Sequence, residues 1–180
     1  MARLSSSSQL RGESSATAFS LIKRYVIPSE YPPSETWRLI EWCRKQGADE
    51  FTIDCLNSDA AAGERLWRQF HALVSPYARG ESVRERMNGK TVDDLTRPTP
   101  IWEFNPFTVG AVRQALPGGL FQYDPWEPAW FEDPILYRNG EMMLGVLSHE
   151  AFAVLRVTES EAAELEDAGF PSHESLPRAS

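Results

Sequence analysis

The sequence lacks the long apolar runs and the leader segment that direct a protein into or across a membrane. No apolar stretch approaches the roughly 18 residues that a membrane helix needs. The N-terminal residues include no hydrophobic segment ahead of a cleavage site, so no secretion signal is predicted. We therefore expect no membrane association and a cytoplasmic location.

Cysteine and histidine are scarce, and their spacing does not indicate a metal site. Cys43 and Cys55 form no CxxC pair, and we expect free, buried thiols in a reducing compartment. The histidines His71, His149 and His173 lie far apart, with no HxxxH, HExxH or mixed Cys/His pattern to bring two ligands onto one face. No metal site is therefore predicted.

Phosphate-binding loops and basic surfaces are also absent. The glycine pair in 117–119 has neither the GxGxxG spacing nor the Lys-Ser/Thr ending of a nucleotide loop, so no cofactor is expected. The net charge of -8 repels nucleic acid and would attract a basic partner. Residues 75–98, the most basic stretch, hold five basic and four acidic side chains, a balance of +1. That balance is too small for a surface that follows a phosphate backbone.

The length of the chain predicts one domain. With 180 residues the chain can bury a single self-supporting core. The first 18 residues contain six serines and few large apolar side chains, so we expect a tail there, and a second tail at 171–180. The domain is expected to cover 19–170.

Periodicity and capping signals predict the elements of this domain. The expected strands are 19–27, 51–56, 101–104, 135–138, 142–147 and 151–157. The expected helices are 34–46 with Ser34 as its cap, 57–74 capped by Asn57, Ser58 or Asp59, 106–116, 158–169, and a small surface helix within 75–98. Asn139-Gly140 predicts a hairpin turn, and Thr158 with Glu161 a capping box. Because strands and helices do not alternate strictly, we expect an α+β fold, with a largely antiparallel sheet of five to six strands packed by three to five helices.

The most unusual stretch is the aromatic-acidic segment, residues 121–133. It holds five aromatic rings, four carboxylates and two prolines, with no lysine or arginine. The prolines predict an irregular segment rather than a helix or a central strand. Its rings either fill the core at one end of the sheet or are exposed for binding to a partner. Both interpretations hold at once if some rings are buried and Trp126 or Trp130 points outward.

The second interpretation predicts a binding surface. Tryptophan and tyrosine are frequent hot-spot residues of interfaces, and a rim of carboxylates steers and pairs a basic partner. The predicted partner-binding residues are Tyr123, Asp124, Trp126, Glu127, Trp130, Glu132 and Asp133. We therefore favour a small, acidic, bacterial-type module without catalysis, comparable in class to immunity proteins and antitoxins, that captures a basic protein.

Two other functions stay open at this stage. A small hydrolase or transferase would use His149 and Asp54 in a tryptophan-lined cleft. Asp54 either faces solvent or pairs with an arginine such as Arg24 or Arg156. Residues 148–150 read Ser-His-Glu, but neighbours on an extended chain point to opposite sides and do not form a relay. A subunit of a larger assembly is the third possibility, and the oligomeric state is left open.

Overall fold

The computed structural model describes residues 22–26, 32–88, 91–94 and 98–170, so the two expected tails lie outside the described residues. The strands are β1 (Ile22–Val26), β2 (Glu50–Asn57), β3 (Ala78–Ser82), β4 (Glu85–Asn88), β5 (Thr91–Asp94), β6 (Thr99–Glu103), β7 (Ala129–Arg138), β8 (Glu141–Leu147) and β9 (Phe152–Val157). The helices are α1 (Pro33–Lys45), α2 (Ala60–Val74), α3 (Pro106–Ala115) and α4 (Glu159–Asp167), with a 3-10 turn, η2 (Ser75–Tyr77).

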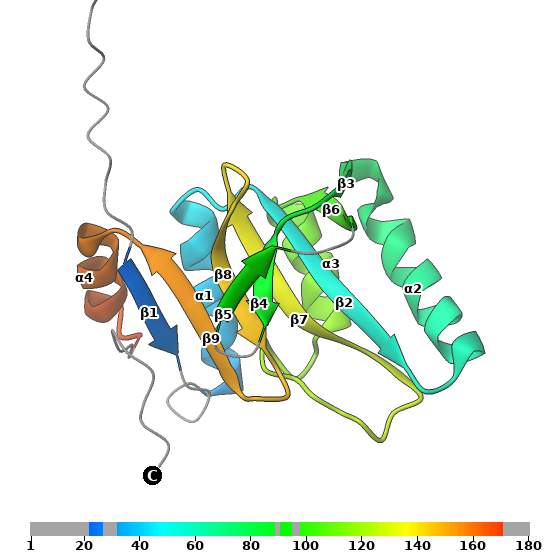
Figure 1. Cartoon of the computed structure of the whole chain (residues 1–180). Coiled ribbons are helices and arrows are strands. Elements are labelled where there is room, and N and C mark those ends of the chain that lie inside the picture. The colour runs from blue at the N-terminus through cyan, green and yellow to red at the C-terminus, as the bar shows by residue number, and fades with distance from the viewer. Residues whose placement is uncertain (1–21, 27–31, 89–90, 95–97, 171–180) are drawn as a thin grey trace, which may run out of the picture.

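The described strands form one large sheet and one small one. The large sheet has seven strands in the order β1-β9-β8-β7-β2-β6-β3, and β4 and β5 pair separately (Figure 1). Every pairing is antiparallel. The α+β class and the antiparallel sheet are confirmed. Within the described residues each helix is too short or too polar to cross a membrane.

The two faces of the large sheet carry different cores. One face packs against the helices, and its centre is a group of rings in which Phe70 lies 4.8 Å from Phe131 and 5.6 Å from Trp102 between ring centroids. The other face carries a smaller apolar cluster that includes Ile135 and Tyr137. In Figure 1, β4 and β5 cross in front of the large sheet, whereas α1 and α3 lie behind it. The two faces explain why central strands such as β8 are apolar on both alternations.

Most of the local signals form as the sequence predicts. Asp59 caps α2 through a 2.7 Å bond from the amide N–H of Ala62 to its carboxylate. Thr158 and Glu161 form the predicted capping box of α4. The expected cap at Ser34 is wrong, because α1 already begins at Pro33 and its cap position, Pro32, makes no side-chain bond. A proline in the first turn fixes φ and needs no partner for a missing N–H.

Residues 75–98 differ from the expectation of a surface helix. After η2 the described chain forms β3, which pairs with β6 at the edge of the sheet, and then β4 and β5. Glu85 begins β4, so the capping-box spacing from Ser82 marks no helix. The charged residues suit β3 because it is an exposed edge strand, and charge on an edge discourages pairing with other chains.

The second half of the aromatic-acidic segment is a strand, which the prolines were expected to exclude. Residues 129–133 begin β7, which lies between β2 and β8 in the sheet. Pro125 and Pro128 precede the strand and do not interrupt it. Pro134 lies at a bulge, since Asp54 faces Glu132 while Thr52 faces Ile135, and a bulge tolerates a residue without a ladder hydrogen bond.

Candidate functional site

Two segments that are distant in sequence meet at one end of the large sheet. The aromatic-acidic segment leads into β7, and residues 148–151 form the turn between β8 and β9. The ring of Tyr123 lies 6.4 Å from that of Trp130 and 6.2 Å from that of His149, between centroids. Tyr123 therefore joins the segment and the turn into one candidate site.

The outermost part of the site is the turn that carries Trp126. The Asp124 carboxylate accepts a 3.2 Å bond from the N–H of Trp126, and the Asp124 carbonyl accepts a 3.3 Å bond from the N–H of Glu127. The carbonyl of Pro128 accepts bonds from the N–H groups of Ser58 and Asp59, which ties the turn to the start of α2. The indole of Trp126 is 93% exposed. The turn therefore holds a large apolar side chain in solvent.

The rings of the segment divide between core and surface. Phe131 is buried in the helix-side core, and Phe121 packs against it, as the interpretation of core-filling rings requires. Tyr123 is 47% exposed, and the half-buried Trp130 faces Leu56 across the β2–β7 pair. Both interpretations of the segment thus apply to different rings.

Glu132 and Asp133 are not on the surface, where a carboxylate rim was expected. They are 5% and 7% exposed. Glu132 accepts a 2.7 Å bond from the indole N–H of Trp130. Asp133 accepts a 2.7 Å bond from the N–H of Ser148 and donates its own N–H to the Ser148 hydroxyl at 3.1 Å. The bulge turns Asp133 to a φ of 50°, a left-handed conformation that aspartate tolerates better than most residues, and this turn brings its carboxylate against the β8–β9 turn.

The environment of these two carboxyls disfavours their charge. Burial raises the pKa of Glu132, and so do the neighbouring Asp133 and Asp54, while the Trp130 hydrogen bond and His149 oppose the shift. Burial likewise raises the pKa of Asp133 against the opposing bonds from Ser148. Within the described residues, neither carboxylate forms an ion pair with lysine or arginine. The site holds more negative than positive charge.

His149 is the one imidazole placed against these carboxylates in the described chain. A ring nitrogen of His149 and one oxygen each of Glu132 and Asp133 all lie within 4.8 Å of one another, so these residues could hold a metal ion. Its Nε2 also lies 3.8 Å from Oε1 of the exposed Glu150. Residues 148–150 lie in a turn rather than on the extended chain that was expected, and the Ser148 hydroxyl bonds with Asp133 and the carbonyl of Leu120 instead of His149.

Asp54 joins the carboxylates rather than an arginine from the far strands. It lies opposite Glu132 in the β2–β7 pair and acts on the pKa of both Glu132 and Asp133. Because β7 and β8 separate β2 from β9, the strands that carry Arg24 and Arg156 are not neighbours of β2. Glu132 and Asp133 lie on β7 and His149 lies on the β8–β9 turn, so the expectation of no metal site, which rests on spacing along the chain, misses this convergence.

No protein-family model, curated protein or solved structure matches the chain. Function is therefore inferred from the residues of the site.

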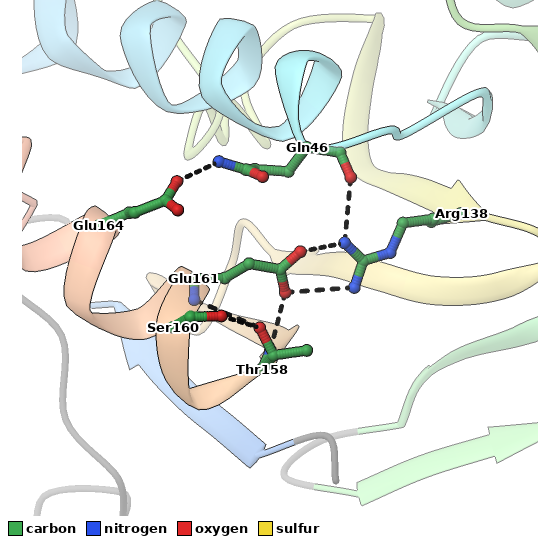
Figure 2. Close-up of polar contacts among 6 residues, drawn as sticks. All are labelled: Gln46, Arg138, Thr158, Ser160, Glu161 and Glu164. Atoms are coloured by element: carbon green, nitrogen blue, oxygen red, sulfur yellow. Dashed lines mark hydrogen bonds and ion pairs between the residues drawn. The ribbon is translucent and has the colours of Figure 1, made fainter. Parts of the chain in front are cut away.

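A cavity lies outside the candidate site, where α1, β7 and α4 meet (Figure 2). Its volume is about 620 Å³. Arg138 donates to the Glu161 carboxylate and, at 3.0 Å, to the carbonyl of Gln46, whose side chain donates to Glu164 at 2.7 Å. Since the arginine and these two carboxylates are already paired, we assign this cluster to the joining of three elements rather than to ligand binding.

Proposed function

We propose that the protein is a non-catalytic, acidic binding module that captures a basic protein, as immunity proteins and antitoxins do. The observation that carries the proposal is the exposure of Trp126 on a turn that hydrogen bonds hold in place. A tryptophan exposed to this degree leaves a large apolar area in water, at about 25 cal/mol for each Å². Burial of that ring by a partner would recover this free energy.

The surroundings of Trp126 suit a basic partner. Tyr123 and Trp130 on the same segment, with rings 6.4 Å apart, and Leu56, which faces Trp130 across the β2–β7 pair, add accessible apolar surface. Asp124 and Glu127 supply carboxylates beside it, in place of the wider rim expected from the sequence. Apolar anchors surrounded by charges of one sign are typical of interfaces in which the charges steer the encounter and the rings supply affinity.

The overall charge and the thiols are consistent with such a module. The net charge of -8 adds a long-range attraction for a basic protein. Cys43 and Cys55 are free in the structure, although Cys43 is buried as expected and Cys55 is only partly buried. Free thiols suit a reducing compartment such as the cytoplasm. The enzyme alternative, which uses His149 and Asp54, is weaker, because the carboxylates that gather around the His149 ring are those of Glu132 and Asp133.

The test is capture of the partner with a matched pair of variants. The tagged protein is incubated with a lysate of its source, bound protein is eluted by a salt gradient, and the eluate is identified by mass spectrometry. We expect one basic protein, released by moderate salt. With the purified partner, Trp126→Ala should raise Kd at least tenfold, about 1.4 kcal/mol, and leave the melting temperature nearly unchanged.

Phe107→Ala is the control. Phe107 is 75% exposed, but it lies in the first turn of α3, near the opposite end of β2, where Glu103 pairs with Glu50. Its loss should leave Kd unchanged. An equal loss of affinity in both variants, or capture of no basic protein by the wild type, contradicts the proposal.

A further inference from the structure

We propose that Glu132, Asp133 and His149 form a binding site for a divalent transition-metal ion. The ligand atoms come from two places in the fold, the bulge of β7 and the turn between β8 and β9. One oxygen of each carboxylate and one ring nitrogen lie within 4.8 Å of one another. The proposed ligands do not include Trp126, so a failure of metal binding can be distinguished from a failure of partner binding.

The separation of the ligand atoms fits an ion after a small closure. Zinc bonds to nitrogen and oxygen at about 2.0 to 2.2 Å, so neighbouring ligands in a tetrahedral site lie about 3.3 to 3.6 Å apart. The side chain of His149 is 46% exposed and sits on a turn, so it is free to rotate toward the carboxylates. Rotation of the imidazole therefore supplies part of the approach that brings the ligand atoms, which lie within 4.8 Å of one another, to bonding distance of one ion.

The burial and charge of the carboxylates supply the independent reason for an ion. Both residues are more than nine-tenths buried, and buried carboxylates are normally paired with a cation or bound to a metal. No described lysine or arginine pairs with either one. Oε1 of Glu132 and Oδ2 of Asp133 accept no hydrogen bond from the described residues. A cation between these oxygens would provide the missing positive charge.

The surrounding hydrogen bonds orient the ligands as outer partners do in metal sites. The other oxygen of Glu132 is held by the indole of Trp130, and that of Asp133 by the N–H of Ser148. Such bonds fix the direction of a ligating carboxylate and are a regular feature of metal centres. They also leave the second oxygen of each carboxylate without a hydrogen bond from the described residues, and so available to an ion.

The donor set selects the class of ion. One imidazole with two carboxylates suits Zn²⁺ or Mn²⁺, whereas Mg²⁺ and Ca²⁺ prefer oxygen ligands alone. Three protein ligands leave at least one coordination position for water.

The test is metal titration of the untagged full chain after removal of metals with a chelator. Isothermal titration calorimetry with ZnCl2, MnCl2 and MgCl2 compares the wild type with Glu132→Gln, which keeps the shape of the side chain, and with His149→Ala. We expect one Zn²⁺ or Mn²⁺ per chain, with Kd at least tenfold lower than for Mg²⁺. Each variant should raise that Kd at least tenfold. Loss of a residue that only hydrogen-bonds to a metal ligand already weakens metal affinity by about 10- to 100-fold, and loss of a ligand should cost no less.

His71→Ala is the matched control. His71 is an exposed histidine on α2, where it lies beside Trp67, and its loss should leave the titration unchanged. Circular dichroism verifies that each variant is folded. The proposal is overturned if the wild type binds neither Zn²⁺ nor Mn²⁺ below about 1 mM, about -4.1 kcal/mol. It is also overturned if folded Glu132→Gln and His149→Ala bind as the wild type does, or if His71→Ala lowers affinity equally.

Discussion

Glu161 links the start of α4 to the end of β7 through a single carboxylate. It accepts hydrogen bonds from the guanidinium of Arg138 and, at 2.7 Å, from the N–H of Thr158, and its side chain is 14% exposed (Figure 2). Burial by itself would raise the pKa of Glu161, but the bonds from Arg138 and Thr158 outweigh it, so the pKa lies below its usual range. The ionised form is therefore favoured by folding.

This shift predicts the pH dependence of Glu161→Gln. A carboxyl whose pKa is lowered on folding contributes stability above its unfolded pKa, about 4.3, and loses that contribution as the pH falls through its folded pKa. At pH 7 the substitution should lower the free energy of unfolding by about 2 kcal/mol, as for hydrogen bonds to charged groups. The difference from wild type should shrink between about pH 5 and pH 3. Urea unfolding at a series of pH values measures it.

Glu164→Gln is the control for that series. Among the described residues the Glu164 carboxylate bonds only with the side chain of Gln46, and Glu164 is exposed. Its replacement should change the free energy of unfolding by less than about 0.5 kcal/mol at any pH. If the cost of Glu161→Gln is the same at pH 3 and pH 7, the Arg138 bond contributes nothing through charge.

At the scale of the element, α2 packs closely against the end of β2 at a glycine. A methyl group added at Gly63 would lie 2.6 Å from Nδ2 and 2.8 Å from Cβ of Asn57. The second atom is bound directly to the backbone, so the strand or the helix would have to move. Gly110, on the exposed side of α3, has no atom within 4 Å of the same position.

The two glycines therefore predict opposite results from the same substitution. Gly→Ala inside a helix gains about 1 kcal/mol from propensity. Gly110→Ala should show about 0.5 to 1 kcal/mol of added stability, because the methyl group meets nothing. At Gly63 the overpacking costs about 1 to 3 kcal/mol, so Gly63→Ala should be neutral to destabilising. The urea midpoints of the two variants measure these changes in stability. Equal stabilisation by both substitutions would mean that the added methyl group at Gly63 meets no steric clash with β2.

The elements also show which structure could be predicted from the sequence. The cap at Asp59, the Thr158 box and the hairpin at Asn139-Gly140 depend on neighbours in the chain, and they form as expected. The strand β3 could not be predicted, because its pairing with β6 offsets poor local propensity. The convergence of Glu132 with His149 was equally hidden, since it depends on a bulge register and on a turn.

At the scale of the whole molecule, a single core connects the elements. The helix-side cluster holds residues of all four α-helices of the described chain. It also holds residues of five strands of the large sheet, β2 and β6 to β9. A core shared in this way cannot be lost from one element without exposing the apolar surface of the others.

We therefore expect unfolding in one cooperative transition. Tryptophan fluorescence reports on the buried Trp42 and Trp102, whereas far-ultraviolet circular dichroism reports on all helices and strands. The two signals should give the same urea midpoint and the same slope. Separate midpoints would show that part of the fold, such as the β4–β5 pair, unfolds independently.

The pairing of β1 with β9 has a consequence for synthesis on the ribosome. Arg24 of β1 lies opposite Leu155 of β9, with most of the described chain between them. A growing polypeptide emerges with its N-terminal end first, so β1 leaves the exit tunnel long before its partner exists. Until β9 appears, β1 and the open side of β8 are both free to pair with strands of other nascent chains. A chain that stalls before β9 should therefore depend on chaperones, which the completed chain no longer needs.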